Sequence, residues 1–229
     1  MSVECTKYAI VTGANRGIGL ACTRALLDAG LHVAMLGRDG YSLADSSAEF
    51  GTRVRVVVCD VANSSAVNAA AQVLVSAWGA PQVVVHNAGI VRRAPVDSLS
   101  DEAWDASLAV NLSGPFYLTR ATMPPMRAAG SGRHVYIASI SSTLGTPQLS
   151  AYCAAKWGVV GFMKSVAEEL RGSGLQAMAV LPGSVDTRML EGSGFAPQMR
   201  PADIASTVVY AALHAPAAMN GSAIEVFGP

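Results

Sequence analysis

The stretch YAIVTGANRGIG, residues 8–19, decides the fold. It begins as an apolar run of strand length, and its glycines lead directly into a segment with helical periodicity. Glycines let the backbone come close to a pyrophosphate, while the following helix offers unpaired N–H groups and the positive end of its dipole. The spacing Gly-x-x-x-Gly-x-Gly departs from the Gly-x-Gly-x-x-Gly fingerprint, and any tight strand-to-helix turn can use glycines. Because the turn follows the first strand of an alternating pattern, we interpret it as a phosphate-binding turn with contacts from Gly13, Asn15, Arg16, Gly17, Ile18 and Gly19.

Strand-like and helix-like segments alternate along the chain. Apolar runs of strand length are separated by longer segments rich in Ala, Leu and Met. This alternation predicts an α/β fold with a doubly wound parallel sheet, helices on both faces, and strand C-termini along one edge, where open α/β sheets bind ligands. The expected strands are 8–12, 32–36, 54–59, 83–86, 134–138, 176–181 and 223–227, and the expected helices are 18–29, 64–78, 101–129, 151–171 and 202–214.

Composition and charge favour one domain over residues 1–229. The chain has 51% hydrophobic and 14% charged residues, which suits a sheet buried on both faces. The formal net charge is zero, with lysines and arginines scattered, so nothing indicates a nucleic-acid partner or an anionic membrane. No apolar run approaches the roughly 18 residues of a spanning helix, and the N-terminus lacks a signal-peptide pattern. We therefore expect a soluble, cytoplasmic protein.

Cysteine and histidine spacing does not indicate a metal site. The cysteines at 5, 22, 59 and 153 form no Cys-x-x-Cys pair, and the histidines at 32, 86, 134 and 214 show no ligand spacing. Cys153 adjoins Tyr152, but neighbouring helical residues point in different directions, so we do not expect a catalytic thiol. Reduced thiols and no metal are the expectation.

Ser139, Tyr152 and Lys156 carry the chemistry. Tyr152 and Lys156 are four positions apart and lie on one face of an expected helix, and Ser139 precedes the tyrosine by thirteen positions. A free tyrosine has a pKa of about 10, and a nearby cation favours its ionised form. Lys156 would thus make Tyr152 a working acid and base. The alternative is an ordinary surface pair on an amphipathic helix.

The end of the second expected strand indicates which dinucleotide binds. Gly37 offers no carboxylate where such a site distinguishes a ribose 2′-hydroxyl from a 2′-phosphate. Arg38, with Arg16 from the glycine turn, could instead hold the phosphate, which favours NADP(H). In the alternative, Asp39 takes the ribose of NAD(H). Asp60, at the end of the third expected strand, could reach the adenine amino group or cap the following helix.

Together, TGANRGIG, Asp60, Asn87-Ala88-Gly89, Asn111, Ser139, Tyr152 and Lys156 resemble the pattern of the short-chain dehydrogenase/reductase family, over essentially all 229 residues. The resemblance implies a single Rossmann-type domain with a seven-stranded parallel sheet. It also implies a catalytic tetrad in which Ser139 hydrogen-bonds the substrate oxygen and Tyr152 donates a proton to it. Lys156 would lower the pKa of the tyrosine and hold the nicotinamide ribose. Asn111 would hold a water that links Lys156 to solvent, or its side chain would bend its helix by competing for backbone hydrogen bonds.

The same resemblance extends the expected cofactor site. Small residues at Asn87-Ala88-Gly89 would allow the cofactor to approach the end of the fourth expected strand closely. His86 stands where members often have Asn, and this change is expected to affect hydrogen bonding at the end of the strand more than the chemistry. Ser141 and Ser142 compete with Ser139 for the catalytic role, and the thirteen-residue separation favours Ser139. The segment 182–187 would wrap the nicotinamide carboxamide. Further expected cofactor contacts are Val61, Pro182, Gly183, Val185 and Thr187.

The expected activity is an NADP(H)-dependent interconversion of a ketone and a secondary alcohol, and the chain resembles 3-oxoacyl-[acyl-carrier-protein] reductases. A 3-oxoacyl thioester therefore heads the substrate list, although Ser173 stands where such reductases often place a basic residue. Arg92 and Arg93 could meet an acidic carrier or form a solvated loop pair. The alternatives are an NAD-dependent alcohol dehydrogenase and a dinucleotide sensor without catalysis.

Two further expectations concern the surroundings of the site. Residues 191–200, with two glycines and a proline, are interpreted as a lid over the substrate, with a plain connecting loop as the alternative. The resemblance implies a homotetramer or homodimer through the helices that contain Asn111 and Tyr152. Ala154, Ala155, Gly158 and Gly161 could permit close helix packing there, or could pack that helix on its own sheet.

Overall fold

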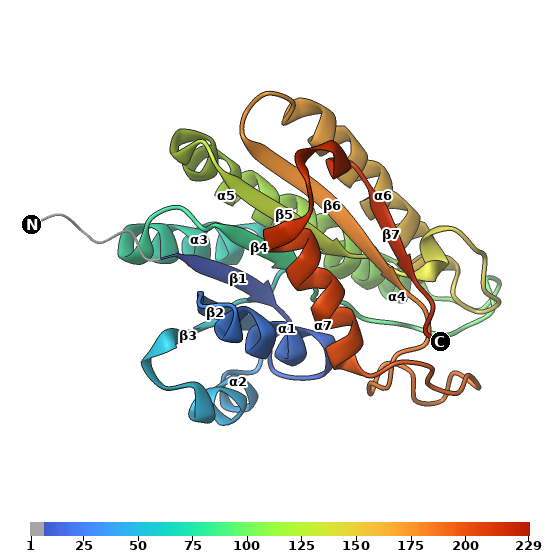
Figure 1. Ribbon diagram of the computed structural model, residues 1–229. Helices are drawn as coiled ribbons and strands as arrows, with labels where there is room; N and C mark the ends of the chain where they lie inside the picture. The colour runs from blue at the N-terminus through green and yellow to red at the C-terminus, as the bar shows by residue number, and fades with distance from the viewer. Residues whose placement is uncertain (1–6) are drawn as a thin grey trace, which may run out of the picture.

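A single parallel sheet organises the molecule, as the computed structural model shows for residues 7–229 (Figure 1). Its seven strands lie in the order β3-β2-β1-β4-β5-β6-β7, and every neighbouring pair is parallel. The expected seven-stranded α/β sheet is confirmed. The strands are β1 (Tyr8–Thr12), β2 (His32–Gly37), β3 (Val54–Val58), β4 (Val83–His86), β5 (Gly132–Ile137), β6 (Leu175–Pro182) and β7 (Ala223–Val226).

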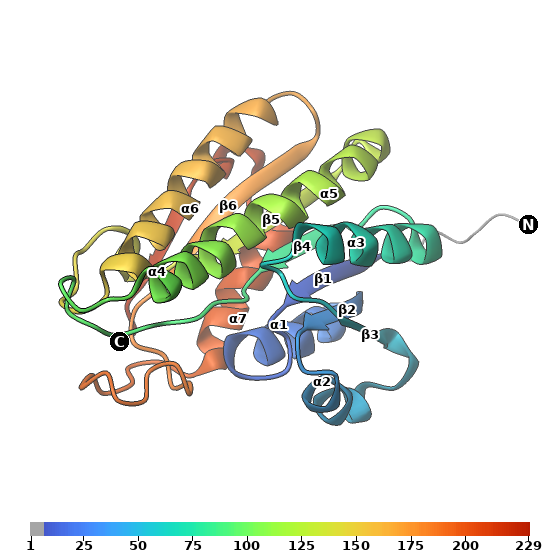
Figure 2. The same cartoon turned by 180° about the vertical axis from the view of Figure 1, so that it is seen from behind.

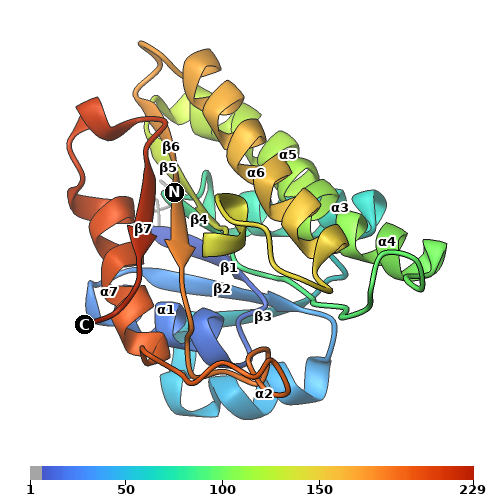
Figure 3. The same ribbon diagram turned by 90° about the vertical axis from the view of Figure 1, so that its right-hand side faces the viewer.

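Helices cover both faces of the sheet, which divides the core in two. Along β1, Ala9 and Val11 pack into one cluster with side chains of α1 and α7, while Tyr8 and Ile10 pack into the other with α3, α5 and α6. Figure 3 shows α1, α2 and α7 on one side of the sheet, and Figure 2 shows the layer of α3 to α6 on the other. The α-helices are α1 (Gly17–Asp28), α2 (Gly40–Ser47), α3 (Ser64–Trp78), α4 (Asp101–Leu108), α5 (Gly114–Ala129), α6 (Ser150–Glu169) and α7 (Pro201–Val209).

The helices differ from the expectation in three places. The segment expected as one helix over 101–129 is interrupted by five residues of π-helix, Ala109–Ser113, between α4 and α5. The helix expected over 202–214 ends in a similar π-helical turn, Tyr210–His214. The helix α2 was not predicted, because its sequence GYSLADSS has a single buried apolar residue, Leu43, and no apolar stripe. Short 3-10 segments occupy Ala48–Arg53, Ile140–Ser142 and Ala217–Met219.

The loops that follow the strands gather at the carboxyl edge of the sheet, where the site lies. The longest, residues 183–200, contains no helix or strand and is tied across its base by a bridge between Val185 and Met199. Within residues 7–229, no helix is long and apolar enough to cross a membrane. Cys5 lies outside the described residues.

Candidate active site

A cavity of about 1760 Å³ opens along the carboxyl edge of the sheet. This volume exceeds the roughly 300–1000 Å³ of a drug-sized ligand pocket, so a dinucleotide and a small substrate can share it. Of the residues predicted as site residues, Gly19 and Asn111 do not line the cavity. Those that do are Gly13, Asn15, Arg16, Gly17, Ile18, Arg38, Asp60, Val61, Asn87, Ala88, Gly89, Ser139, Tyr152, Lys156, Pro182, Gly183, Val185 and Thr187.

The glycine turn leaves room only for backbone. Gly13 and Gly17 have positive φ angles of 62° and 53°, which favour glycine. A Cβ on Gly19 would lie 2.2 Å from the carbonyl oxygen of Gly13 and 2.5 Å from the Asn87 amide nitrogen. The turn therefore packs tightly against Asn87 at the end of β4, and the absence of a side chain at Gly19 makes this close packing possible.

The N-terminus of α1 offers donors to an anion. The N-cap residue Arg16 makes no side-chain capping bond, and the first turn contains no acidic residue. The Arg16 side chain therefore does not cap the first N–H groups of the helix. These groups lie beside the cavity, which Gly17 and Ile18 line. These features fit the phosphates of a dinucleotide.

Thr12, the last residue of β1, joins the glycine turn to the end of β4. Its hydroxyl oxygen accepts hydrogen bonds from the backbone N–H groups of Asn87 (3.0 Å) and Ala88 (2.9 Å). The Asn87 side chain in turn donates to the carbonyl oxygens of Thr12 (2.9 Å) and Gly13 (3.1 Å). The sequence reasoning missed this role of Thr12, although a polar residue at the end of a buried strand was a signal for it.

At the end of β2, two arginines and one aspartate border the cavity. The Asp39 carboxylate is the N-cap of α2 and accepts from the Ser42 backbone N–H at 3.1 Å. Arg38 and Arg16 take part in none of the ion pairs formed within residues 7–229. One oxygen of the Asp39 carboxylate is thus used to cap α2, while both guanidinium groups remain available to an anion.

Asp60 stabilises a turn and does not cap α3. Its carboxylate accepts from the Ala62 backbone N–H at 3.0 Å, and it borders the cavity. The N-cap of α3 is Asn63, whose side chain accepts from the Ala66 N–H at 2.9 Å. The alternative in which Asp60 caps the following helix is therefore wrong.

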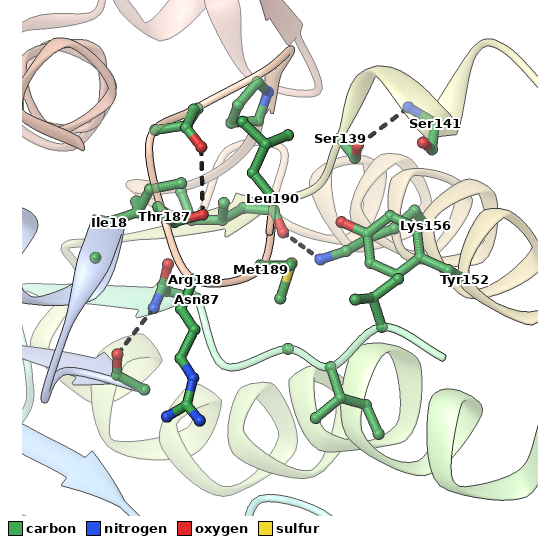
Figure 4. Close-up of a pocket in the computed structure, with 18 of the residues that line it drawn as sticks. Ile18, Asn87, Ser139, Ser141, Tyr152, Lys156, Thr187, Arg188, Met189 and Leu190 are labelled. Carbon is green, nitrogen blue, oxygen red and sulfur yellow. Dashed lines mark hydrogen bonds between the residues drawn. The ribbon is translucent and has the colours of Figure 1, made fainter. Parts of the chain in front are cut away.

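Ser139 follows β5 and faces the start of α6. Its hydroxyl oxygen accepts from the Ser141 N–H at 3.1 Å, and a hydrogen bond between Ser139 and Tyr152 favours the ionised phenol. Ser141 also borders the cavity, whereas the buried Ser142 does not. Figure 4 shows Tyr152 and Lys156 reaching from α6 with Ser139 opposite the phenol. The preference for Ser139 thus rests on contact with the tyrosine as well as on spacing.

Burial controls the ionisation of Tyr152 and Lys156. Burial raises the pKa of Tyr152 to about 12, while the hydrogen bond to Ser139 and the charge of Arg93 act in the opposite direction. Burial also lowers the pKa of Lys156 to about 8. The ammonium donates to the Ile137 carbonyl at 2.7 Å and lies 5.6 Å from the centre of the Tyr152 ring. At neutral pH the phenol is protonated and most of the lysine is charged.

Asn111 holds the loop after β4 in place. It lies in the π-helical segment between α4 and α5, and its side-chain amide donates to the carbonyl oxygens of Ile90 (3.0 Å) and Ser107 (2.9 Å). Its side-chain oxygen accepts from the Ile90 N–H at 3.2 Å. The helix changes its hydrogen-bond pattern at this asparagine, in agreement with the bending role. The role in holding a water stays a prediction.

His86, the last residue of β4, is buried in the core. Its Nε2 is 3.1 Å from Nδ1 of His134, and its ring stacks on Tyr136 with 4.3 Å between ring centres. A hydrogen bond of 2.8 Å between the hydroxyl groups of Thr119 and Tyr136 completes the cluster. Within residues 7–229, no group of three or more His, Cys, Asp or Glu side chains could hold a metal ion.

Comparison with known proteins shows the family of this chain. Residues 7–195 match the family model described as short chain dehydrogenase. The chain is 34% identical to D-threitol dehydrogenase of Mycolicibacterium smegmatis, over 97% of this chain and 92% of that protein. It is 33% identical to a 3-oxoacyl-[acyl-carrier-protein] reductase of Synechocystis, over 100% and 98% of the two chains. A gluconate 5-dehydrogenase from Burkholderia cenocepacia, solved in complex with NADP and tartrate, superposes with a TM-score of 0.89 at 29% identity, over 97% of this chain and 94% of that one. The match of family model, fold and full-length relatives shows that this chain belongs to the short-chain dehydrogenase/reductase family, whose enzymes use NAD(P) to act on the CH–OH group of an alcohol or on the carbonyl of the corresponding ketone.

Proposed function

We propose that the protein uses NADP(H) to interconvert a ketone and a secondary alcohol. The observation that carries the proposal is the meeting of the half-buried Ser139 with the buried Tyr152 and Lys156 beside a cavity of dinucleotide size. When bound, the nicotinamide supplies the hydride that adds to the carbonyl carbon. The residues of this chain have to bind the cofactor and the substrate, orient them, and protonate the substrate oxygen.

In the reducing direction, Tyr152 acts as the general acid. Its O–H bond breaks as a new O–H bond forms on the substrate oxygen, and a solvent proton restores the phenol afterwards. Because the pKa of Tyr152 is raised to about 12, the phenol holds this proton at neutral pH. Ser139 donates a hydrogen bond to the same oxygen, and the charge of Lys156 stabilises the phenolate that forms. The reverse sequence oxidises an alcohol.

The preference for NADP(H) rests on two arginines. The guanidinium groups of Arg38 and Arg16, which form no ion pair within residues 7–229, suit a 2′-phosphate, whereas the Asp39 carboxylate is engaged as a helix cap. The gluconate 5-dehydrogenase that resembles this chain was solved with NADP. An NAD-dependent alcohol dehydrogenase, with Asp39 on the ribose, is the alternative.

Replacement of Arg38 by alanine should reduce NADPH affinity selectively. We expect the dissociation constant of NADPH to rise about 10- to 100-fold, the effect of one lost charge-assisted contact, with that of NADH changed less than about threefold. Binding is measured by titration of cofactor fluorescence. Asp39→Ala serves as the matched variant, since the NAD alternative expects it to weaken NADH. Equal losses for both cofactors in Arg38→Ala would contradict the role of Arg38.

The substrate we propose is a short 3-oxoacyl compound, as a thioester or as the free acid. The Synechocystis relative is named for a 3-oxoacyl thioester and the Burkholderia protein for the acid gluconate. The test measures NADPH and NADH oxidation by the purified wild-type protein with 3-oxoacyl thioesters, oxo acids and neutral ketones. Turnover of at least one class with NADPH is expected. Tight NADPH binding without turnover of any ketone would favour a dinucleotide sensor.

We also propose a homo-oligomer formed through α4, α5 and α6. Trp104, Phe116 and Trp157 expose large apolar surfaces on these helices. Gly158 packs on Leu112 of its own chain, whereas a Cβ on Gly161 would meet nothing within 4 Å. Light scattering in solution should give two or four times the mass of the chain, and a monomer would contradict the proposal.

A further inference from the structure

Three loops that are far apart in the sequence meet on the Tyr152 side of the cavity. They comprise residues 90–93 after β4, 144–149 before α6 and 187–193 after β6, and all line the cavity. Figure 4 shows the last of these loops, from Thr187 to Leu190, along the border of the cavity. We call this region the substrate side.

Two hydrogen bonds join these loops. The backbone N–H of Ala94, which directly follows the first loop, donates to the Gln148 carbonyl at 3.1 Å, and the Arg93 guanidinium donates to the Met189 carbonyl at 2.9 Å. Gln148 has a positive φ of 62°, an uncommon conformation for a residue other than glycine, and such strain often occurs where a site is held ready for a ligand. Arg93 therefore stands at the junction of two of the loops.

Within residues 7–229, the charge of Arg93 has no acidic partner. A guanidinium has five N–H donors, and the bond to the Met189 carbonyl occupies one of them on a neutral oxygen. Arg93 takes part in none of the ion pairs among the described residues. Its field reaches Tyr152, where it lowers the pKa of the phenol against the effect of burial. A substrate whose oxygen contacts that phenol therefore comes within range of an unmatched positive charge.

This geometry points to a substrate with its own negative charge. Resting on the proposed ketone reduction, we propose that Arg93 is a specificity-determining residue that binds the carboxylate of a short oxo acid, or of the hydroxy acid in the reverse reaction. The planar guanidinium matches the two oxygens of a carboxylate, and a thioester offers no such anion. With the carboxylate on Arg93 and the carbonyl oxygen on Tyr152 and Ser139, the acid is held at two points. Two-point binding presents one face of the carbonyl to the hydride.

The neighbouring Arg92 provides a matched control. It lies on the same loop, it is exposed like Arg93, and it borders the cavity. Among the described residues, however, its guanidinium donates to the carbonyl of the adjacent Val91 at 3.3 Å and to no other loop, whereas the charge that lowers the pKa of Tyr152 is that of Arg93. A general effect of positive charge on this loop would therefore appear in both variants, whereas carboxylate binding would appear in Arg93 alone.

The first experiment compares short 2-, 3- and 4-oxo acids with their methyl esters in NADPH-dependent turnover. We expect the wild-type enzyme to prefer at least one acid to its ester by about tenfold or more in kcat/KM. Arg93→Gln should lower kcat/KM for the acid about 10- to 100-fold and leave the ester within about threefold, while Arg93→Lys restores part of the loss. Arg92→Gln should change neither. Equal loss for acid and ester in Arg93→Gln would show that Arg93 only holds the 187–193 loop and would overturn the proposal, as would a wild-type preference for the esters.

A binding measurement separates this proposal from the proposed function. Calorimetry with butanoate, a short acid without a ketone, is performed on protein loaded with NADP⁺. We expect binding to wild-type and Arg92→Gln protein and a dissociation constant at least about tenfold higher in Arg93→Gln. If butanoate binds in this way but no ketone is reduced, the proposed function fails and the carboxylate site stands. If ketones are reduced but butanoate binding is absent or unchanged in Arg93→Gln, the carboxylate site fails and the proposed function stands.

Discussion

Protein with methionine in place of Lys156 is expected to lose nearly all turnover and yet to be more stable than the wild type at neutral pH. Lys156 is 4% exposed, and burial lowers its pKa from 10.5 to about 8. Holding the charged form at pH 7 therefore costs about 3 kcal/mol relative to the unfolded chain. Lys156→Met removes this cost, but it also removes the hydrogen bond from Lys156 to the Ile137 carbonyl, which contributes about 1 kcal/mol to the stability of the wild type. We expect the free energy of unfolding to rise by about 2 kcal/mol in Lys156→Met.

The stability gain should depend on pH in a defined direction. Because the pKa of Lys156 is lower in the folded than in the unfolded chain, the unfolded state binds more protons between about pH 8 and 10.5. Wild-type stability should thus rise across this window by about 3 kcal/mol. The advantage of Lys156→Met should be complete below the window and become a deficit of about 1 kcal/mol above it, where only the lost hydrogen bond to Ile137 counts. Urea unfolding at pH 7 and pH 10.5 measures both limits.

Tyr152→Phe is the matched control for Lys156→Met. Loss of the general acid should lower kcat about 10²- to 10⁴-fold. The phenol of Tyr152 is neutral at pH 7 in both the folded and unfolded chain, since burial raises its pKa to about 12. Tyr152→Phe should therefore lose turnover without the pH-dependent gain in stability. A Lys156→Met protein that is less stable than wild type at pH 7 would show that the ammonium is not held at a cost.

The strands β1, β2, β4, β5 and β6 were predictable because each is a largely buried apolar run. The bounds of β1 and β4 agree with the expected ranges 8–12 and 83–86, where every residue is buried. Helical periodicity could not show the π-helical segment Ala109–Ser113, because its five residues are far fewer than the roughly 11–18 over which a period is read. The helix α2 escaped prediction because its capping by Asp39, and not an apolar face, determines where it begins.

The candidate site was predictable where motif residues touch the cavity themselves. The contributions of Thr12 and Arg93 depend on partners more than 70 positions away, and local spacing carries no information on such pairs. The ionisation of Tyr152 shows a similar limit. The sequence placed a lysine one turn away and predicted a lowered pKa, whereas the folded chain buries the phenol, and burial raises that pKa.

The core histidines produce the second large effect, a loss of stability in mild acid. His86 and His134 are buried against each other, with Nε2 of His134 lacking a partner among the described residues. Burial lowers the pKa of His86 well below its usual range and that of His134 to about 3. Both rings are therefore neutral in the folded chain at pH values where an unfolded histidine, with a pKa near 6.5, takes up a proton.

Because the unfolded state binds more protons below about pH 6.5, each histidine should lower the free energy of unfolding by about 1.4 kcal/mol per pH unit. Between pH 6.5 and 5.0 the pair should remove about 3 kcal/mol, because an unfolded histidine is only half protonated at pH 6.5. This is a large part of the roughly 5–15 kcal/mol that stabilises an ordinary domain. Urea unfolding at these two pH values should show a much smaller loss for the double variant His86→Asn/His134→Leu than for wild type. The exposed His214 gives the control, since His214→Gln should keep the full wild-type loss. Equal losses in the wild type and the double variant would mean that acid destabilises the fold through its carboxylates, whereas a restored stability would identify the histidine pair as the acid-sensitive part of the core.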